Sequence, residues 1–260
     1  MKIEDKSRQQ AYETLRLSFG VLGVIKYTDP ETKETYYYLM MNKKRTQPEQ
    51  SAYGFIGGAI KCPPEETRKV LNEISPSEYQ IEKDDLRVSG VPVNYSEQVI
   101  DTLLNLARNN NPVEQLLQEI EEELGKEILI INNKMGTNIK QPEHLDVIVK
   151  EVQEALSHQD YGTYTFGPER SARNPTQLSQ RIALLFEIDL TEIPCLLEYI
   201  RNNSMDTQNL DPKNPPLFLI LSDDQIRELL ENKPQGENYF LGNLAIASQI
   251  EILKNTLIKV

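Results

Sequence analysis

Alternating apolar and polar positions near the start of the chain predict a β-hairpin. Residues 18–27 (SFGVLGVIKY) and 35–44 (TYYYLMMNKK) are rich in β-branched and aromatic side chains. Between them, Asp29-Pro30-Glu31-Thr32 has the composition of a turn. Residues 53–61 (YGFIGGAIK) predict a further strand, interrupted by Gly57-Gly58. Adjacent glycines within a strand indicate a bulge or a close backbone approach.

Helical spacing replaces this alternation in residues 111–125 (NPVEQLLQEIEEELG). Asn111 can cap the first turn, Pro112 suits the first helical position, and Gly125 can end the helix in a left-handed conformation. One apolar stripe runs along the predicted helix, formed by Val113, Leu116, Leu117, Ile120 and Leu124. The segment therefore predicts an amphipathic helix that packs against a core.

The rest of the chain alternates between strand-like and helical patterns. Strands are predicted at Ile128–Ile131, 181–190 and 216–221, and helices at 142–157, after a capping Ser222, and at 241–257. Within residues 62–110, a short strand is predicted near 84–89 and a helix at 96–108, with prolines at 63, 64 and 76 as breaks. We expect one α/β domain, residues 1–260, with a sandwich of helices around a mixed sheet.

Composition and charge narrow the class of protein. Among 260 residues, 40 are acidic and 28 basic, so the formal net charge is −12, which argues against a broad nucleic-acid surface. The two cysteines, Cys62 and Cys195, are far apart and favour half-buried free thiols over zinc ligation or a disulfide. No apolar run has the length of a membrane span and no signal-peptide pattern begins the chain, so we expect a soluble cytoplasmic protein.

The helix predicted at 111–125, which we call the acidic helix, carries a charge pattern that indicates a metal site. Glu119, Glu122 and Glu123 fall at i, i+3 and i+4, so their carboxylates share a face and repel one another. Mg²⁺ prefers oxygen ligands and often binds a few carboxylates together with substrate phosphates. A solvated acidic face is the commoner explanation of such a run, and the helix alone does not choose between the two.

Together, the glycine pair and the acidic helix resemble the signature of the Nudix hydrolases. In that family a strand that ends in Gly-Gly precedes a helix reading Arg-Glu-apolar-x-Glu-Glu-x-Gly, and this chain has Gly57-Gly58 and Gln118-Glu119-Ile120-Glu121-Glu122-Glu123-Leu124-Gly125. The resemblance implies an α/β/α sandwich and a site for Mg²⁺ or Mn²⁺. Its implied ligands are Glu119, Glu122, Glu123 and the carbonyl of Gly57, with Gly58 beside the substrate.

Several positions depart from the family pattern. Residues 62–110 separate the glycines from the helix, Gln118 stands where the family has Arg, and Asn110 falls where the family has a loop Glu. A split motif with Asp85-Leu86-Arg87 in the insertion is similar to the SMODS-associated Nudix domains, a bacterial subgroup found beside antiphage signalling enzymes. The insertion could be a surface excrescence, or a lid or dimer contact over the ligand.

Other residues are candidates for substrate contacts. The segment 161–173 (YGTYTFGPERSAR) has aromatic residues with Arg170 and Arg173, which could hold a base or a phosphate, or it could be a polar connecting loop. Glu187 interrupts an apolar strand, and the resemblance offers Glu187 or Glu169 as an extra metal ligand. We expect His144 and His158 to lie on the surface.

Three functions stay open at this level. The resemblance implies a metal-dependent hydrolase that cleaves a nucleoside diphosphate linked to another moiety: a nucleotide sugar, ADP-ribose, a dinucleotide or a nucleoside triphosphate. The neutral Gln118 and the insertion favour instead a sensor that binds such a nucleotide without cleaving it. The third alternative is an unrelated α/β interaction protein with a chance acidic helix. A homodimer is compatible with each.

Overall fold

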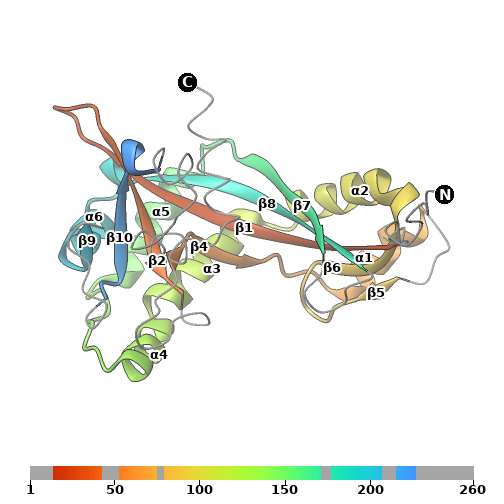
Figure 1. The fold of residues 1–260 in the computed structure, drawn as a ribbon, viewed down its shortest axis with the longest axis horizontal. Helices are drawn as coiled ribbons and strands as arrows, with labels where there is room; N and C mark the ends of the chain where they lie inside the picture. Colours follow the sequence, from red (N-terminus) through yellow and green to blue (C-terminus); the bar gives the residue numbers. More distant parts are fainter. Residues whose placement is uncertain (1–13, 43–52, 75–78, 171–176, 207–214, 227–260) are drawn as a thin grey trace, which may run out of the picture. The chain divides into compact units, whose positions relative to one another are not determined.

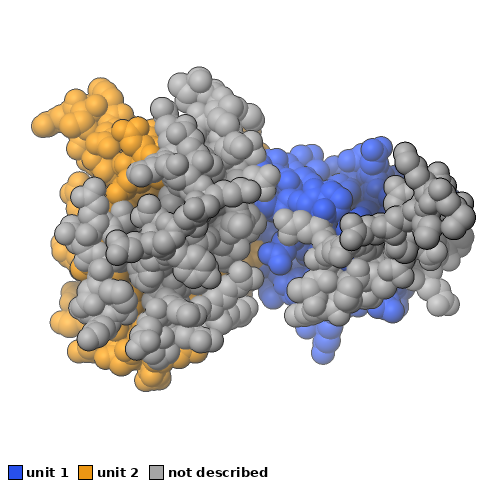
Figure 2. Space-filling model, viewed as in Figure 1, with its two compact units in different colours: residues 1–21, 59–112, 163–184 blue, residues 22–58, 113–162, 185–260 orange. Residues whose placement is uncertain are grey.

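The computed structural model describes residues 14–42, 53–74, 79–170, 177–206 and 215–226. The chain divides into two compact units, which Figure 2 shows in blue and orange. Unit 1 contains residues 1–21, 59–112 and 163–184. Unit 2 contains residues 22–58, 113–162 and 185–260. The insertion 62–110 therefore belongs to unit 1, whereas both the glycine pair and the acidic helix belong to unit 2.

Strands and helices alternate along the chain, and the described strands form one mixed sheet (Figure 1). The strands are β1 (Thr14–Thr28), β2 (Thr35–Met41), β3 (Tyr53–Gly54), β4 (Ile56–Ala59), β5 (Gln80–Ile81), β6 (Arg87–Pro92), β7 (Gly162–Arg170), β8 (Leu178–Asp189), β9 (Ser204–Asp206) and β10 (Phe218–Ser222). The helices are α1 (Pro64–Asn72), α2 (Ser96–Asn109), α3 (Pro112–Leu124), α4 (Lys126–Met135), α5 (Leu145–Leu156) and α6 (Pro194–Asn202), with 3₁₀ turns at Val93–Tyr95 and Leu190–Glu192. The expected α/β class is confirmed.

β1 and β2 form the predicted hairpin. The strands are antiparallel, with Ile25 opposite Tyr38 and Thr28 opposite Thr35. In the turn, the carboxylate of Asp29 accepts hydrogen bonds from the backbone N–H groups of Glu31 at 2.8 Å and Thr32 at 2.9 Å. On the far edge of β2, β10 is antiparallel to β2 and parallel to β9, so the sheet is mixed, as expected.

In unit 2, α3 packs against the sheet through its predicted apolar stripe. Leu116, Leu117, Ile120 and Leu124 are buried. Gly23 of β1 allows the close packing, because a Cβ atom there would lie 2.7 Å from Cδ1 of Ile188 in β8 and 3.4 Å from Cδ1 of Leu116. The small residue thus lets side chains from β8 and α3 meet over β1.

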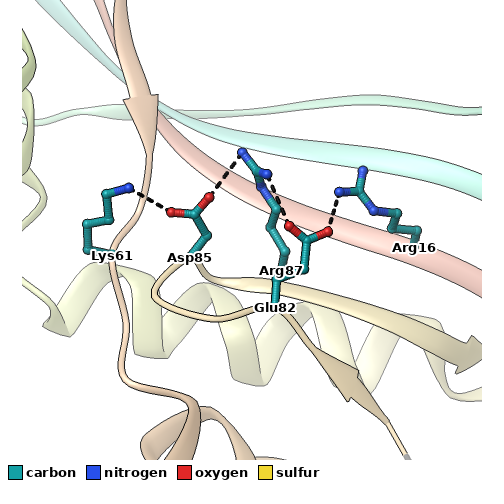
Figure 3. Close-up of polar contacts among 5 residues, drawn as sticks. All are labelled: Arg16, Lys61, Glu82, Asp85 and Arg87. Carbon is teal, nitrogen blue, oxygen red and sulfur yellow. Dashed lines mark hydrogen bonds and ion pairs between the residues drawn. The ribbon is translucent and has the colours of Figure 1, made fainter. Parts of the chain in front are cut away.

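In unit 1, the insertion is tied to β1 by strand pairing and by charge. β6 is antiparallel to both β5 and β1, and α1 contacts α2. Figure 3 shows an alternating series of side chains, Arg16, Glu82, Arg87, Asp85 and Lys61, joined by ion pairs. The pairs Arg87–Glu82 and Lys61–Asp85 have N–O distances of 3.1 and 2.7 Å. We refer to these five residues as the charge ladder.

Two sequence predictions near the end of α3 were wrong. Ile128–Ile131 lies in α4 and is not a strand. Ile128 and Ile131 are buried while Leu129 and Ile130 are 55% and 42% exposed, which is helical spacing that a short apolar run conceals. Gly125 has φ −99° and is not left-handed, because α4 begins at the next residue.

Position 125 requires glycine because a side chain there would not fit. The residue is buried, and a Cβ atom would lie 2.6 Å from the carbonyl oxygen of Glu121 and 3.3 Å from Leu145. At the other end of α3, Pro112 is the first helical residue, as predicted, and Asn111 has φ 46°, whereas an N-cap residue usually has extended backbone.

Most other elements agree with the sequence. The predicted helices at 96–108 and 142–157 correspond to α2 and α5, and the predicted strands at 181–190 and 216–221 correspond to β8 and β10. Ser222 accepts a hydrogen bond from N–H of Gln225 at 3.3 Å, and the Gln225 side chain accepts one from N–H of Ser222 at 2.9 Å, which is a capping box. The helix expected at 241–257 lies outside the described residues.

Candidate functional site

The glycine pair and the acidic helix meet in unit 2, although residues 59–112 separate them in the chain. Backbone N–H of Gly57 donates a hydrogen bond to Oε1 of Glu123, at an N–O distance of 3.4 Å. Gly57 has φ 152°, a value that L residues rarely adopt, so glycine is required to direct this N–H at the helix. β4, which contains the pair, is hydrogen-bonded to β1, the strand on which α3 packs.

Gly58 makes room for the second carboxylate. A Cβ atom at position 58 would lie 2.0 Å from Oε1 and 2.6 Å from Oε2 of Glu119. The carboxylate of Glu119 therefore lies directly over the glycine backbone, in space that any other residue would fill. Two acidic side chains of α3, one turn apart, thus contact consecutive glycines of β4.

The helix geometry explains the different exposure of the three glutamates. Glu119 and Glu123 are half-buried beside the apolar stripe, whereas Glu122 is exposed, as are Glu121 and Gln118. Successive residues are 100° apart around a helix, so Glu122 lies farther from the stripe than Glu119 or Glu123. The structure therefore brings two of the three predicted glutamates to the glycine pair and leaves the third toward solvent.

Two carboxylates beside glycine backbone fit a hard divalent cation. Mg²⁺ is usually bound through one or two carboxylates, with water and substrate phosphates as its other ligands. Among the residues that the structure describes, no group of three or more His, Cys, Asp or Glu side chains is arranged to hold a metal ion. Glu119 and Glu123 are two carboxylates, so a cation held by them would need water or substrate phosphates as its other ligands.

Glu187, a candidate metal ligand from the sequence, pairs with a lysine within the sheet. Its carboxylate forms an ion pair with Nζ of Lys26, the neighbouring strand's side chain. The two side chains are 41% and 26% exposed. Burial, together with the negative charges of Asp223 and Glu187, raises the pKa of Tyr37 to about 12. Glu187 therefore belongs to a sheet-borne cluster with Lys26 and Tyr37.

The segment 161–173 is not a loop over most of its length. Residues 162–170 form β7, which pairs with β8. The side chains of Glu169 and Arg170 and the whole of Arg173 lie outside the described residues, so their predicted substrate contacts stay predictions. The aromatic residues Tyr164 and Phe166 contact each other edge to face, with ring centroids 4.7 Å apart.

The remaining candidates are placed as expected. His144 and His158 are exposed, and both cysteines are free thiols, Cys62 buried and Cys195 half-buried. Burial raises the pKa of the Cys62 thiol, so it is held in its unreactive protonated form. No helix in the described ranges is long and apolar enough to cross a bilayer.

Sequence reasoning missed Gln141, which fixes the end of the acidic helix. Its side-chain amide donates a hydrogen bond of 2.6 Å to the carbonyl oxygen of Gly125. This bond satisfies a carbonyl at the junction of α3 and α4, where the helical ladder is interrupted. A glutamine in a polar segment gives no sequence signal for such a role.

No protein-family model, curated protein or solved structure matches this chain.

Proposed function

We propose that this chain is a metal-dependent diphosphate hydrolase of the Nudix type, with its site at Gly57, Gly58, Glu119 and Glu123. The observation that supports the proposal most strongly is the contact between the paired glycines and two carboxylates of α3. A solvated acidic face would not need a glycine pair from a distant strand beneath it. The proposal includes the α/β/α sandwich of that family for the arrangement of sheet and helices.

The residues of the site have separate roles in this proposal. Glu119 and Glu123 would hold Mg²⁺ or Mn²⁺, and N–H of Gly57 orients the carboxylate of Glu123. Gly58 leaves the space that the Glu119 carboxylate occupies. A bound divalent ion would supply neutralisation of diphosphate charge and a lower pKa for a ligated water. Glu122, which is exposed on the same helix, is the proposed general base for an attacking water.

The substrate class follows from the same resemblance. It is a nucleoside diphosphate linked to another moiety: a nucleotide sugar, ADP-ribose, a dinucleotide or a nucleoside triphosphate. The similarity of the split motif to the SMODS-associated subgroup is the reason to propose a role in bacterial antiphage defence. A second candidate, a sensor that binds the nucleotide without cleaving it, is favoured by the neutral, exposed Gln118, which cannot form the charge-assisted hydrogen bonds of an arginine.

The metal site is tested by thermal unfolding with and without Mn²⁺, at constant ionic strength because the chain carries a net charge of −12. We expect Mn²⁺ to raise the melting temperature of the wild type, since a ligand that binds only the folded state stabilises it. Glu119→Gln and Glu123→Gln should abolish the rise. Glu121→Gln, which removes an exposed charge from the same helix, and Glu187→Gln should retain it. Equal responses in all four variants would refute the site.

Hydrolysis is tested by a screen of nucleoside diphosphate derivatives with Mn²⁺, in which release of phosphate or nucleoside monophosphate is measured. The hydrolase predicts turnover that Glu119→Gln and Glu123→Gln abolish and Glu121→Gln preserves. The sensor predicts saturable binding of a derivative with no product. Restoration of turnover in Gln118→Arg would show that the missing arginine limits catalysis.

A further inference from the structure

A cavity in unit 2 lies between α6 and the segment that joins α4 to α5. Its volume is about 780 Å³, within the range of small-molecule sites. Residues 137–144 form one wall, Cys195, Glu198, Tyr199 and Asn202 of α6 form another, and Ile148 and Pro215 add apolar surface. None of these residues belongs to the glycine–glutamate site.

Residues 137–144 form neither a helix nor a strand, but side-chain hydrogen bonds hold this segment in place. Asn132 accepts hydrogen bonds from Thr137 Oγ1 at 2.8 Å and from N–H of Ile139 at 2.9 Å, and donates one to the Ile139 carbonyl at 2.8 Å. The hydroxyl of Tyr199 donates to the carbonyl of Lys140 at 2.8 Å. An irregular segment held by several side chains is a typical wall for a binding site.

The charged residues around the cavity favour a positively charged ligand over a negatively charged one. Two carboxylates, Glu143 and Glu198, line it, against one ammonium group, Lys140. Asn202 is the last residue of α6, so the negative end of the helix dipole also faces this region. Arg201, the one basic residue of α6, lies over the ring of Tyr27 at 5.4 Å from the centroid and does not line the cavity.

An anion is disfavoured here for a second reason. The positive N-terminus of α6 is already occupied, because N–H of Cys195 donates a hydrogen bond to the carboxylate of Glu151 at 3.3 Å. Glu143, His144, Glu198 and Asn202 form no side-chain hydrogen bond or ion pair with any residue that the structure describes. Two carboxylates, Glu143 and Glu198, thus line the cavity, and one backbone donor at the start of α6 is already used by Glu151.

We propose that this cavity binds an organic cation: a primary amine attached to an apolar or aromatic body. The ammonium group forms an ion pair with Glu198 and is attracted by the negative end of the α6 dipole. The apolar body packs on Tyr199, Ile148 and Pro215. The site is separate from the proposed diphosphate chemistry and does not depend on it.

The test compares two probes of similar shape and opposite charge, tryptamine and indole-3-acetate. The chain contains no tryptophan, so the anisotropy of indole fluorescence reports the probe when excitation is set at the red edge of indole absorption, where tyrosine hardly absorbs. We expect saturable tryptamine binding and none of indole-3-acetate. Glu198→Gln should weaken binding about threefold to fivefold, the effect of one partly exposed ion pair. Glu97→Gln, which removes an exposed charge from α2 in unit 1, should leave the affinity unchanged.

Three results would overturn the proposal. These are no saturable binding of tryptamine, equal binding of indole-3-acetate, and equal weakening by Glu97→Gln and Glu198→Gln, which would indicate attraction to the net negative charge alone. Glu198 and Asn202 are exposed, so their substitution should not prevent folding, and Asn202→Ala provides a second variant at the same wall. Weaker binding in both wall variants, with the control unchanged, would support it.

Discussion

The functional importance of Gly58 lies in the carboxylate above it. Many glycines are required by their backbone angles, but at this position the limiting contact is with the end of the Glu119 side chain. A flexible side chain can move aside at small cost, so the fold should tolerate a methyl group that the site does not. A substitution at position 58 would therefore separate folding from the proposed metal binding without the removal of any charge.

For Gly58→Ala, we predict a melting temperature close to that of the wild type and a loss of most of the Mn²⁺-dependent rise. The reason is that a Cβ atom 2.0 Å from Oε1 of Glu119 must displace this carboxylate. The control is Gly162→Ala, whose Cβ atom would have an ordinary contact of 3.9 Å with Leu185. Thermal unfolding with and without Mn²⁺ measures both effects. A full Mn²⁺ response in Gly58→Ala would contradict the assignment of Glu119.

A pH-dependent contribution to stability is expected at Glu82 in the charge ladder. The hydrogen bond from Arg16, together with that from Arg87, holds the pKa of Glu82 below its ordinary value of 4.5. Because the folded pKa is the lower one, this stabilisation is complete above about pH 4.5 and is lost as the pH falls through the folded pKa. The pairs are partly exposed, so the effect should be below about 1 kcal/mol.

We therefore predict that Glu82→Gln lowers the free energy of unfolding more at pH 6 than at pH 3. Urea unfolding at both values measures the difference, with Glu65→Gln, an exposed change in α1, as the control. A deficit of the same size at both pH values would show that the Glu82 side chain acts through packing and not through its charge.

At the scale of elements, α3 packs so closely on the sheet that position 23 has no room for a side chain. A Cβ atom at this position would lie 2.7 Å from Cδ1 of Ile188, which is closer than packed atoms approach. Unlike the Glu119 carboxylate, Ile188 is fully buried and cannot turn toward solvent. The same added methyl group should therefore have a much larger effect at position 23 than at position 58.

Gly23→Ala should destabilise the protein by about 1–3 kcal/mol, the usual cost of overpacking a core. Ile188→Val removes the atom that limits the space, so the double variant should lose less stability than the sum of the two single changes. A double-mutant cycle of urea unfolding measures this coupling. Additive effects would show that the loss of stability in Gly23→Ala does not come from a clash with Ile188.

The elements that sequence analysis predicted correctly are those with a local signal. The β1–β2 hairpin has Asp29 in its turn, and the helix after β10 has Ser222 and Gln225 in its capping box. Ile128–Ile131 was assigned wrongly because four consecutive apolar residues suit a strand and a helix equally well. The pairing of β6 with β1 and the contacts of Gln141 depend on residues distant in the chain, and no local pattern reports them.

At the scale of the whole molecule, the glycine–glutamate site illustrates the same limit. The two motifs were visible in the sequence, and their resemblance to a known signature predicted that they would meet. The partner of Glu187, the exposure of Glu122 and the cavity beside α6 depend on how the sheet and helices pack, so the sequence did not indicate them.

The excess of acidic residues should also govern solubility. With a net charge of −12 at pH 7 and an isoelectric point of about 4.8, the chain repels its copies at neutral pH and loses that repulsion as carboxylates are protonated. We predict a solubility minimum near pH 4.8, measurable by light scattering across a pH series. A minimum near neutral pH would instead indicate association through specific contacts.

The division into two units limits how the chain can be truncated. The polypeptide passes from one unit to the other after Val21, Gly58, Pro112, Gly162 and Leu184. Each unit consists of three separate chain segments, so a single truncation cannot release either unit as an uninterrupted fragment.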